Sequence, residues 1–534
     1  MDKLHYIHSR AGHIGGSADT APGDIDAIVE ALAQDPRKHL VIHFHGGLVS
    51  KKIGLSIAER LLNEDKVYSS TPITGGYPVF FVWESGAWET IRNNLTELAD
   101  EPVFKQLLRK LVQYALERLG AQDTFGHARS VGQMSCGALT IEVKNAFDIF
   151  WTKPEKSTIP YHKFIPLVGT TQARSASLGI SEDEIQADLE QDPKFLEALA
   201  SLPDLPAATR SAFAPRGMLE HRSAFSELAS REFSKTSATR GLVELYQVVK
   251  FITTTLRGVL RRYADGRDHG FYATCVEELV RNFKVAGSGL NEWGKALEWN
   301  RMKQDTADAF GPDSEVHAGT AFLARLKKAF SNGLQLDRIT LVGHSTGAVY
   351  IAHWLEHCKK YFPENLKQDI IFLAPAITHD LFSQTIQTCE SHIGNFRMFA
   401  MKDTLERDDQ VWGQDDELPD GQDWRRFIYP SSLLYLVSGI LESRLDSTGH
   451  LKDEPDMPIL GMERFLVMKD TYADASFPSV KFIRDWLQQV PGRMVWSKST
   501  DQPGGFNSES ADHGAFDNDA ATLQSLRVIV ETGF

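Results

Sequence analysis

Two parts of the chain alternate between short apolar runs and segments with helical periodicity. Near the start, the β-rich run KHLVIHFHGG (38–47) ends in a pair of glycines, and apolar residues then recur on one helical face over 50–65. A second apolar run, YPVFFVWESG (77–86), predicts another buried strand. The order strand, helix, strand predicts a parallel βαβ unit, because a crossover helix commonly joins neighbouring parallel strands.

This alternation stops between about residues 101 and 329 and then resumes. Helical periodicity dominates the interruption, for example over 102–120 and 242–264, so we expect a mainly helical insertion. We therefore expect a doubly wound, mostly parallel α/β sheet built from 1–100 and 330–534, with 101–329 inserted as a cap or an interaction domain. The strands expected after the insertion lie within 337–347, 369–376, 396–401 and 492–499.

Candidate chemistry is sought at the carboxyl ends of the strands, where open α/β sheets bind their ligands. The sequence GHSTG (343–347) occupies such a position, because the strand-like run ITLV leads into it and the helical run AVYIAHWLEH follows it. A turn this tight forces Ser345 into a strained backbone conformation and exposes its hydroxyl near the positive end of the following helix. Gly343 and Gly347 remove side chains that would otherwise collide. Ser345 is therefore the candidate nucleophile.

The order of elements and the GHSTG turn resemble the α/β-hydrolase superfamily, in particular its serine esterase and lipase branches. The resemblance covers about residues 38–90 and 335–534, and the helical block lies outside it. It implies a catalytic triad whose members follow one another along the chain as Ser, acid and His.

The resemblance also indicates where the two partners of Ser345 should lie. It places the base in the loop after the last predicted strand, at His513, with His450 as the competing C-terminal histidine. It places the acid just after the strand 396–401, at Asp403. Two further carboxylates follow closely and stay open as alternatives, Asp408 and Asp409.

Acyl transfer also needs N–H donors for the oxyanion. The segment HFHGGL (43–48) follows the first strong strand and resembles the HGG-type loop of lipases and esterases, whose glycines let the backbone approach the substrate. We expect one donor from this loop, near Gly47 and Leu48, and the other from the N–H of Thr346. The candidate oxyanion and substrate-binding residues are Gly46, Gly47, Leu48, Thr346 and His344.

Three other patterns have alternative readings. His43 and His45 share a strand face and could be metal ligands, but no matching His/Asp cluster follows downstream, so we expect them to shape the loop. The acidic loop 415–423 lacks the spacing of an EF-hand and is typical of a solvated loop. The segment WESGAW (83–88) either lines a substrate pocket or belongs to the core.

Composition narrows the class of protein. The chain of 534 residues carries 57 Lys and Arg against 71 Asp and Glu, a net charge of −14, which disfavours binding to nucleic-acid backbones. Its 4 cysteines are widely spaced, which excludes a disulfide scaffold and a cysteine-rich zinc module.

The start has no apolar run long enough for a signal peptide, and charged residues interrupt the most apolar window, 242–260. We expect a cytoplasmic protein without a transmembrane segment.

The expected function is that of a serine hydrolase that cleaves a small-molecule ester or a lipid-like ester through an acyl-enzyme on Ser345. The proposed chemistry needs no metal or organic cofactor. The same triad could serve a peptidase, a thioesterase or an acyltransferase. An alternative of another class is a hydrolase-fold interaction protein whose helical insertion binds a partner.

Overall fold

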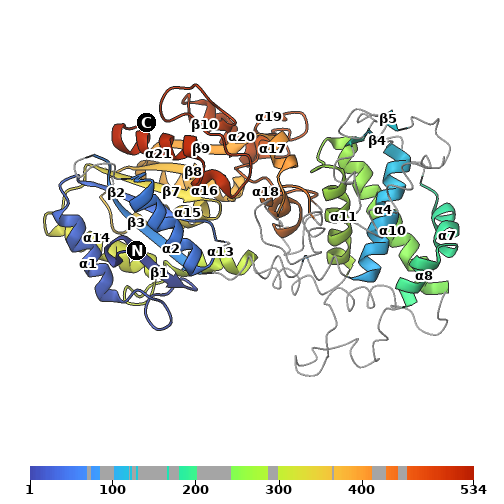
Figure 1. Ribbon diagram of the computed structural model, residues 1–534, viewed down its shortest axis with the longest axis horizontal. Helices are drawn as coiled ribbons and strands as arrows, with labels where there is room; N and C mark the ends of the chain where they lie inside the picture. Colours follow the sequence, from blue (N-terminus) through green and yellow to red (C-terminus); the bar gives the residue numbers. More distant parts are fainter. Residues whose placement is uncertain are drawn as a thin grey trace. The chain divides into compact units, whose positions relative to one another are not determined.

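The computed structural model of the chain divides into two compact units (Figure 1). Unit 1 comprises Met1–Ile91, Leu297–Asp409 and Met457–Phe534, and unit 2 comprises Arg92–Ala296 and Gln410–Asp456. The residues that the structure describes are 1–47, 49–68, 74–84, 95, 101–119, 121–122, 128–129, 165–166, 180–200, 242–286, 299–363, 366–411, 429–442 and 454–534.

A parallel sheet of seven strands forms the centre of unit 1, in the order β1-β3-β2-β7-β8-β9-β10. The predicted βαβ unit is confirmed, because β2 pairs in parallel with β3 and α2 lies between them in the chain. Edge strand β1 was not predicted, since polar His8 and Ser9 interrupt its apolar pattern although both are buried. The strands are β1 Tyr6–Arg10, β2 His39–Phe44, β3 Tyr77–Glu84, β7 Arg338–His344, β8 Gln368–Leu373, β9 Ile393–Met401 and β10 Met494–Ser497.

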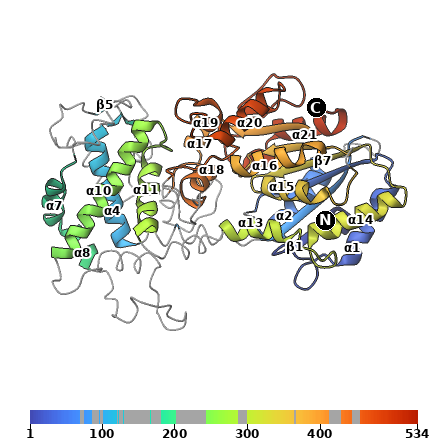
Figure 2. The same ribbon diagram turned by 180° about the vertical axis from the view of Figure 1, so that it is seen from behind.

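Helices cover both faces of this sheet (Figures 1 and 2). On one face, Val41 of β2 and Val342 of β7 belong to a core cluster with residues of α2 and α21, such as Leu526. Successive side chains of a strand point to opposite faces, so Phe44 points to the other face from Val41. On that face Phe44 of β2 stacks on Tyr350 of α15. The helices of unit 1 are α1 Pro22–Gln34, α2 Lys51–Glu59, α13 Trp299–Asp308, α14 Ala318–Ser331, α15 Gly347–Cys358, α16 His379–Cys389, α17 Asp403–Asp408, α19 Glu463–Val467, α20 Pro478–Gln488 and α21 Ala520–Thr532.

The described part of unit 2 is mainly helical. Helices α4, α10 and α11 pack against one another, and α7 and α8 pack beside them. A small antiparallel sheet has β4 between β5 and β6. The elements are α4 Pro102–Leu119, α7 Glu182–Glu190, α8 Pro193–Ala200, α10 Leu242–Asp265, α11 Phe271–Ala286, α18 Leu433–Leu436, β4 Ala121–Gln122, β5 Ala128–Arg129 and β6 Ile165–Pro166.

The division differs from the expected insertion of residues 101–329 at two places. Residues 297–329 belong to unit 1, because α13 packs on α15 and α14 packs on α1. Residues 410–456 belong to unit 2 although they lie far from it in sequence. They are held there by an ion pair between Arg267 and Asp456 and by packing against α11.

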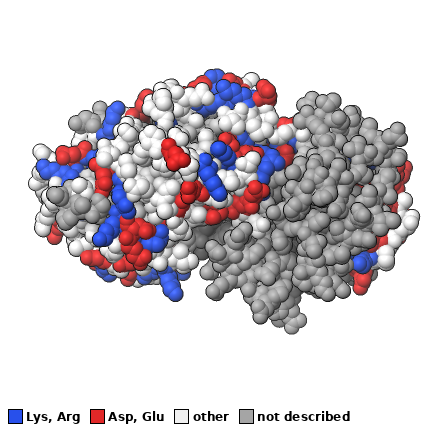
Figure 3. Space-filling model, turned by 45° about the horizontal axis from the view of Figure 1, so that its top comes forward, with Lys and Arg blue, Asp and Glu red and all other residues white. Residues whose placement is uncertain are grey.

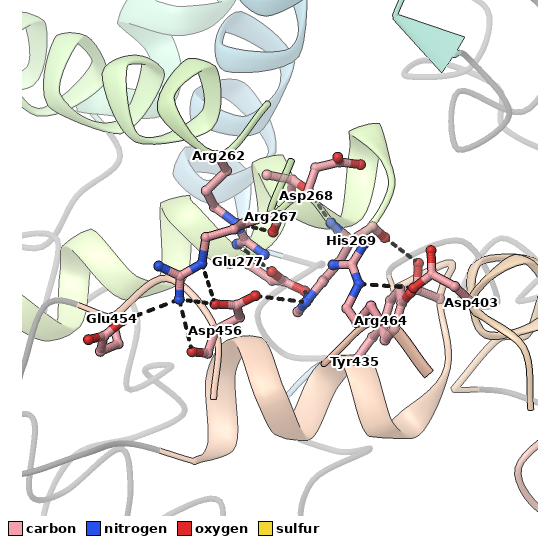
Figure 4. Close-up of polar contacts among 12 residues, drawn as sticks. Arg262, Arg267, Asp268, His269, Glu277, Asp403, Tyr435, Glu454, Asp456 and Arg464 are labelled. Carbon is pink, nitrogen blue, oxygen red and sulfur yellow. Dashed lines mark hydrogen bonds and ion pairs between the residues drawn. The ribbon is translucent and has the colours of Figure 1, made fainter. Parts of the chain in front are cut away.

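A network of buried charges connects the elements of unit 2 (Figure 4). Arg262 of α10 and Glu277 of α11 are both fully buried, and their side chains lie 2.5 Å apart. Glu277 Oε1 also lies 2.9 Å from His269 Nδ1 and accepts a hydrogen bond from the Tyr429 hydroxyl. The carboxylate of Glu277 therefore links α10, α11 and the segment 410–456 through Tyr429. Removing it would leave the buried guanidinium of Arg262 without its principal counter-charge.

Among the helices that the structure describes, none combines the length and the hydropathy required to cross a bilayer. Acidic and basic side chains lie interspersed over the described part of the face in Figure 3. The net acidic charge of the chain is thus not gathered into one patch on that face.

Candidate functional site

Ser345 lies in the turn between β7 and α15, at the carboxyl edge of the sheet. Strand β7 ends at His344 and α15 begins at Gly347, and Ser345 has a φ of 52°. Backbone hydrogen bonds to Leu373 and Ala376 help to hold this left-handed conformation. Ser345 N–H donates to the carbonyl of Leu373 at 2.9 Å, and Ala376 N–H donates to the carbonyl of Ser345 at 3.0 Å. The surrounding structure therefore imposes a conformation that a non-glycine residue adopts at a cost of about 1–3 kcal/mol.

The two glycines of GHSTG are required by close backbone approaches. A Cβ on Gly343 would lie 2.9 Å from the carbonyl group of Gly347, and a Cβ on Gly347 would overlap the carbonyl oxygen of Phe44. The spacing of the motif thus has a steric cause in this structure. The helix can start next to β2 and β7 only because both positions lack a side chain.

His513 contacts Ser345. It lies in the loop after β10, and its Nε2 is 2.9 Å from Ser345 Oγ. Ser345 is 3% exposed and His513 is 7% exposed, so the pair is almost entirely removed from solvent. Burial lowers the pKa of His513 to about 3, and nearby His344 also lowers it. The imidazole is therefore neutral at pH 7 and able to accept the proton of the serine hydroxyl.

Two neighbours hold the backbone of His513. His344 Nε2–H donates to the carbonyl oxygen of His513 at 3.0 Å, and the two rings stack with centroids 5.6 Å apart. The N–H of His513 donates to Asp409 Oδ2 at 3.0 Å. His344, grouped with the candidate substrate-binding residues by its place in GHSTG, thus lies where it positions His513.

The candidate acids of the sequence occupy different surroundings. The carboxylate of Asp403 accepts hydrogen bonds from Arg464 at 2.9 Å (Figure 4) and from Arg407 at 3.1 Å. Asp408 is exposed, whereas Asp409 is buried and bonded to His513. The sequence favours Asp403 because it directly follows β9. In the structure Asp409 lies beside His513, because α17 carries the chain from Asp403 to Asp409, whose carboxylate accepts the backbone N–H of His513.

Gly46, the first glycine after β2, lies directly against Ser345. A Cβ on Gly46 would be 3.3 Å from the Cβ of Ser345. The N–H of Gly47 donates to Thr346 Oγ1 at 2.6 Å, so one of the two backbone N–H groups expected near the oxyanion, those of Gly47 and Leu48, is bonded to the side chain of Thr346. The glycine loop and the serine turn are therefore joined by a side-chain hydrogen bond.

The histidines before this loop shape it. His45 Nε2 accepts the backbone N–H of Trp83 at 3.1 Å, so its Nδ1 carries the proton and donates to the carbonyl of Gly46 at 2.6 Å. His43 Nδ1 lies 2.6 Å from the Tyr68 hydroxyl. Burial lowers the pKa of His45 to about 4. Within the described part of the chain, no group of three or more His, Cys, Asp or Glu residues is arranged to hold a metal ion.

Trp83 and Met302 adjoin the glycine loop. A Cβ on Gly47 would overlap the Trp83 ring and the Met302 sulfur, and both side chains are buried. Glu84 instead approaches His8, with 3.6 Å between Glu84 Oε1 and His8 Nε2. Met302 was not among the candidates from the sequence, because its helix carries no local signal that links it to the loop after β2.

Some candidates of the sequence lie outside the described residues, namely Leu48, Trp88, His450 and the acidic loop 415–423.

No family model matches the chain, and neither a curated protein nor a solved structure is significantly similar to it. The class that the fold defines is an α/β protein with a parallel seven-stranded sheet.

Proposed function

We propose that this protein is a serine hydrolase of the α/β-hydrolase type that cleaves carboxylic esters. The observation that carries the proposal is the 2.9 Å contact between Ser345 Oγ and His513 Nε2, made by a serine held at positive φ. A serine hydroxyl is a weak nucleophile without an adjacent base. Burial that keeps the imidazole of His513 neutral supports the role of general base.

The proposed reaction has two halves. Ser345 Oγ attacks the acyl carbon as His513 Nε2 takes the hydroxyl proton, and the electrons of the carbonyl π bond move to the carbonyl oxygen. Collapse of this tetrahedral intermediate breaks the bond to the alcohol oxygen, which takes the proton back from His513. Water then attacks the acyl-enzyme with the same base and releases the acid and free Ser345.

Asp409 is the proposed orienting carboxylate. When Ser345 donates to Nε2, the proton of the neutral imidazole is on Nδ1, and Nδ1 has no hydrogen-bond partner among the described residues. A buried N–H without an acceptor costs about 1–3 kcal/mol. The Asp409 carboxylate is already bonded to the backbone N–H of the same histidine. A side-chain rotation at Asp409 toward the ring would satisfy Nδ1–H and stabilise the imidazolium during the reaction.

The position of the pair in the sheet also supports the proposal. Ser345 follows β7 and His513 lies in the loop after β10, so both extend from the carboxyl ends of parallel strands. Ligands of open α/β sheets bind at this edge. An ester substrate is favoured over a peptide by the resemblance of 43–48 to the glycine loop of lipases and esterases.

A fluorophosphonate probe tests this function, because it reacts only with an activated serine. We expect labelling of the wild type and loss of labelling in Ser345→Ala and His513→Gln. Ser383→Ala is the matched control, since Ser383 is a buried serine on α16 whose hydroxyl donates only to the Asp380 carbonyl among the described contacts. A panel of p-nitrophenyl esters, a thioester and a peptide substrate then ranks the reactions. A folded wild type that neither labels nor turns over an ester would favour the interaction protein instead.

A further inference from the structure

The hydroxyl of Thr346 uses only its acceptor capacity within the described part of the chain. Thr346 Oγ1 accepts the N–H of Gly47 at 2.6 Å. A threonine hydroxyl can accept and donate at the same time. No acceptor for its proton is found among the described residues, and Thr346 is 1% exposed. A buried hydroxyl thus retains a proton available for donation.

Thr346 is next to the candidate nucleophile in the chain, and its hydroxyl contacts the glycine loop. Thr346 follows Ser345 directly, and the hydroxyl contacts Gly47, the neighbour of the glycine that abuts the Cβ of Ser345. The backbone N–H of Thr346 precedes the first turn of α15 and likewise finds no partner among the described residues. The residue that follows Ser345 and contacts the glycine loop therefore offers two donors, an N–H and an O–H.

We propose that Thr346 is a catalytic residue whose hydroxyl, together with its backbone N–H, donates a hydrogen bond to the oxyanion of the ester substrate. The inference rests on the proposed hydrolase function. When Ser345 Oγ bonds to the acyl carbon, the carbonyl π electrons move to the oxygen and the serine proton moves to His513. Thr346 keeps its own proton and shares it in a hydrogen bond that strengthens as the oxygen becomes negative.

The contact with Gly47 has a defined part in this arrangement. An N–H that donates to Oγ1 polarises the hydroxyl and makes it a stronger donor, because hydrogen bonds in a chain reinforce one another. It also fixes the χ1 rotamer of Thr346, so the donor is in place before the substrate binds. The Gly47 N–H, expected from the sequence to contact the oxyanion, then acts through Thr346 and is a positioning group.

Thr346→Val tests the proposal, because valine keeps the shape of the side chain and loses the hydroxyl. We expect kcat for p-nitrophenyl butyrate to fall by about 10²–10³-fold, the usual effect of losing one oxyanion donor. KM should stay within about threefold, since the ground-state carbonyl gains little from the donor. The inhibition constant of an alkyl trifluoromethyl ketone, which forms an alkoxide on the serine, should rise by the same factor as kcat falls.

Two further variants separate donation from packing. Thr346→Ser retains the hydroxyl and should stay within about tenfold of the wild type in kcat, a smaller loss than one missing oxyanion donor causes. Thr385→Val is the matched control, because it removes a buried threonine hydroxyl on α16 whose one hydrogen bond to a described residue goes to the Leu381 carbonyl of the same helix. If Thr346→Val does not fold, Thr346→Cys provides the same comparison, since a thiol is a weak donor of similar size.

The inference is overturned if a folded Thr346→Val keeps kcat and ketone affinity within threefold of the wild type. It is also overturned if the valine and serine variants lose equal activity, because the hydroxyl would then not be the relevant group. A wild type that fails to react with fluorophosphonate or to hydrolyse any ester argues against the hydrolase function itself. The two failures are therefore distinguishable.

Discussion

The Nε2 atom of His513 lies 2.9 Å from the Oγ of Ser345, although 168 residues separate the two in the chain. Ser345 follows β7 and His513 follows β10, and strands β8 and β9 lie between these two strands in the sheet. The loop after β10 must therefore cross the ends of two strands to bring the imidazole to the serine. His344 and Asp409 hold the backbone of that loop at its carbonyl and its N–H.

The first prediction compares the two candidate acids. Asp409→Asn should lower kcat by about 10²–10⁴-fold with little change in stability, because the amide cannot balance the charge of the imidazolium. Asp403→Asn should instead lower the free energy of unfolding by about 2 kcal/mol, because it weakens the ion pair of buried Arg464. Steady-state kinetics and urea denaturation on both variants check this. A large loss of kcat in Asp403→Asn alone would instead identify Asp403 as the acid.

The second prediction concerns the pH dependence of kcat/KM. The base must be neutral to accept a proton, so activity falls when the pH drops through its pKa in the free enzyme. Burial lowers the pKa of His513 to about 3, whereas an ordinary histidine titrates near 6.5. The rate should therefore change little between pH 8 and about 5.

His344 provides the control for this profile. It lowers the pKa of His513, so His344→Asn should move the acidic limb toward higher pH while the amide can still donate to the His513 carbonyl. The measurement is the pH profile of kcat/KM for a neutral ester, compared between the wild type and His344→Asn. An acidic limb near pH 6.5 in the wild type would contradict the expected effect of burial.

The third prediction concerns the glycine that starts α15. Gly347→Ala places a methyl group against the carbonyl of Phe44, so it should destabilise the protein by about 1–3 kcal/mol and displace Ser345. Gly23→Ala is the control, because no atom lies within 4 Å of a Cβ at that position in α1. Thermal unfolding and fluorophosphonate labelling measure both effects. Equal behaviour of the two variants would remove the steric explanation of the motif.

The fourth prediction concerns the buried network of unit 2. Glu277→Ala leaves the guanidinium of Arg262 buried without its closest counter-charge, and the expected loss of unfolding free energy is about 3–5 kcal/mol. Asp485→Asn removes an exposed ion pair with Lys481 and should leave stability unchanged within error. Denaturation curves compare the variants. A mild effect of Glu277→Ala would show that Arg262 is adequately neutralised by its other neighbour, Glu278.

Most strands of unit 1 follow from the sequence, because strands of a parallel sheet are buried on both faces and show as continuous apolar runs. Strand β1 does not, since its buried residues include His8 and Ser9, whose surroundings are built by distant parts of the chain. The assignment of 410–456 to unit 2 escapes the sequence for a similar reason. Its contacts, such as Arg267 with Asp456, join residues 189 positions apart.

The α/β alternation and the strained turn at Ser345 can be predicted without the structure, because both depend on residues that are neighbours in the chain. Three other relationships are visible only in the folded chain: Asp409 and His344 contact His513, the Thr346 hydroxyl accepts the N–H of Gly47, and Met302 adjoins the glycine loop. These relationships depend on which side chains meet at the edge of the folded sheet. No local period of hydrophobic residues encodes such distances, because they arise from how strands and loops far apart in sequence pack together.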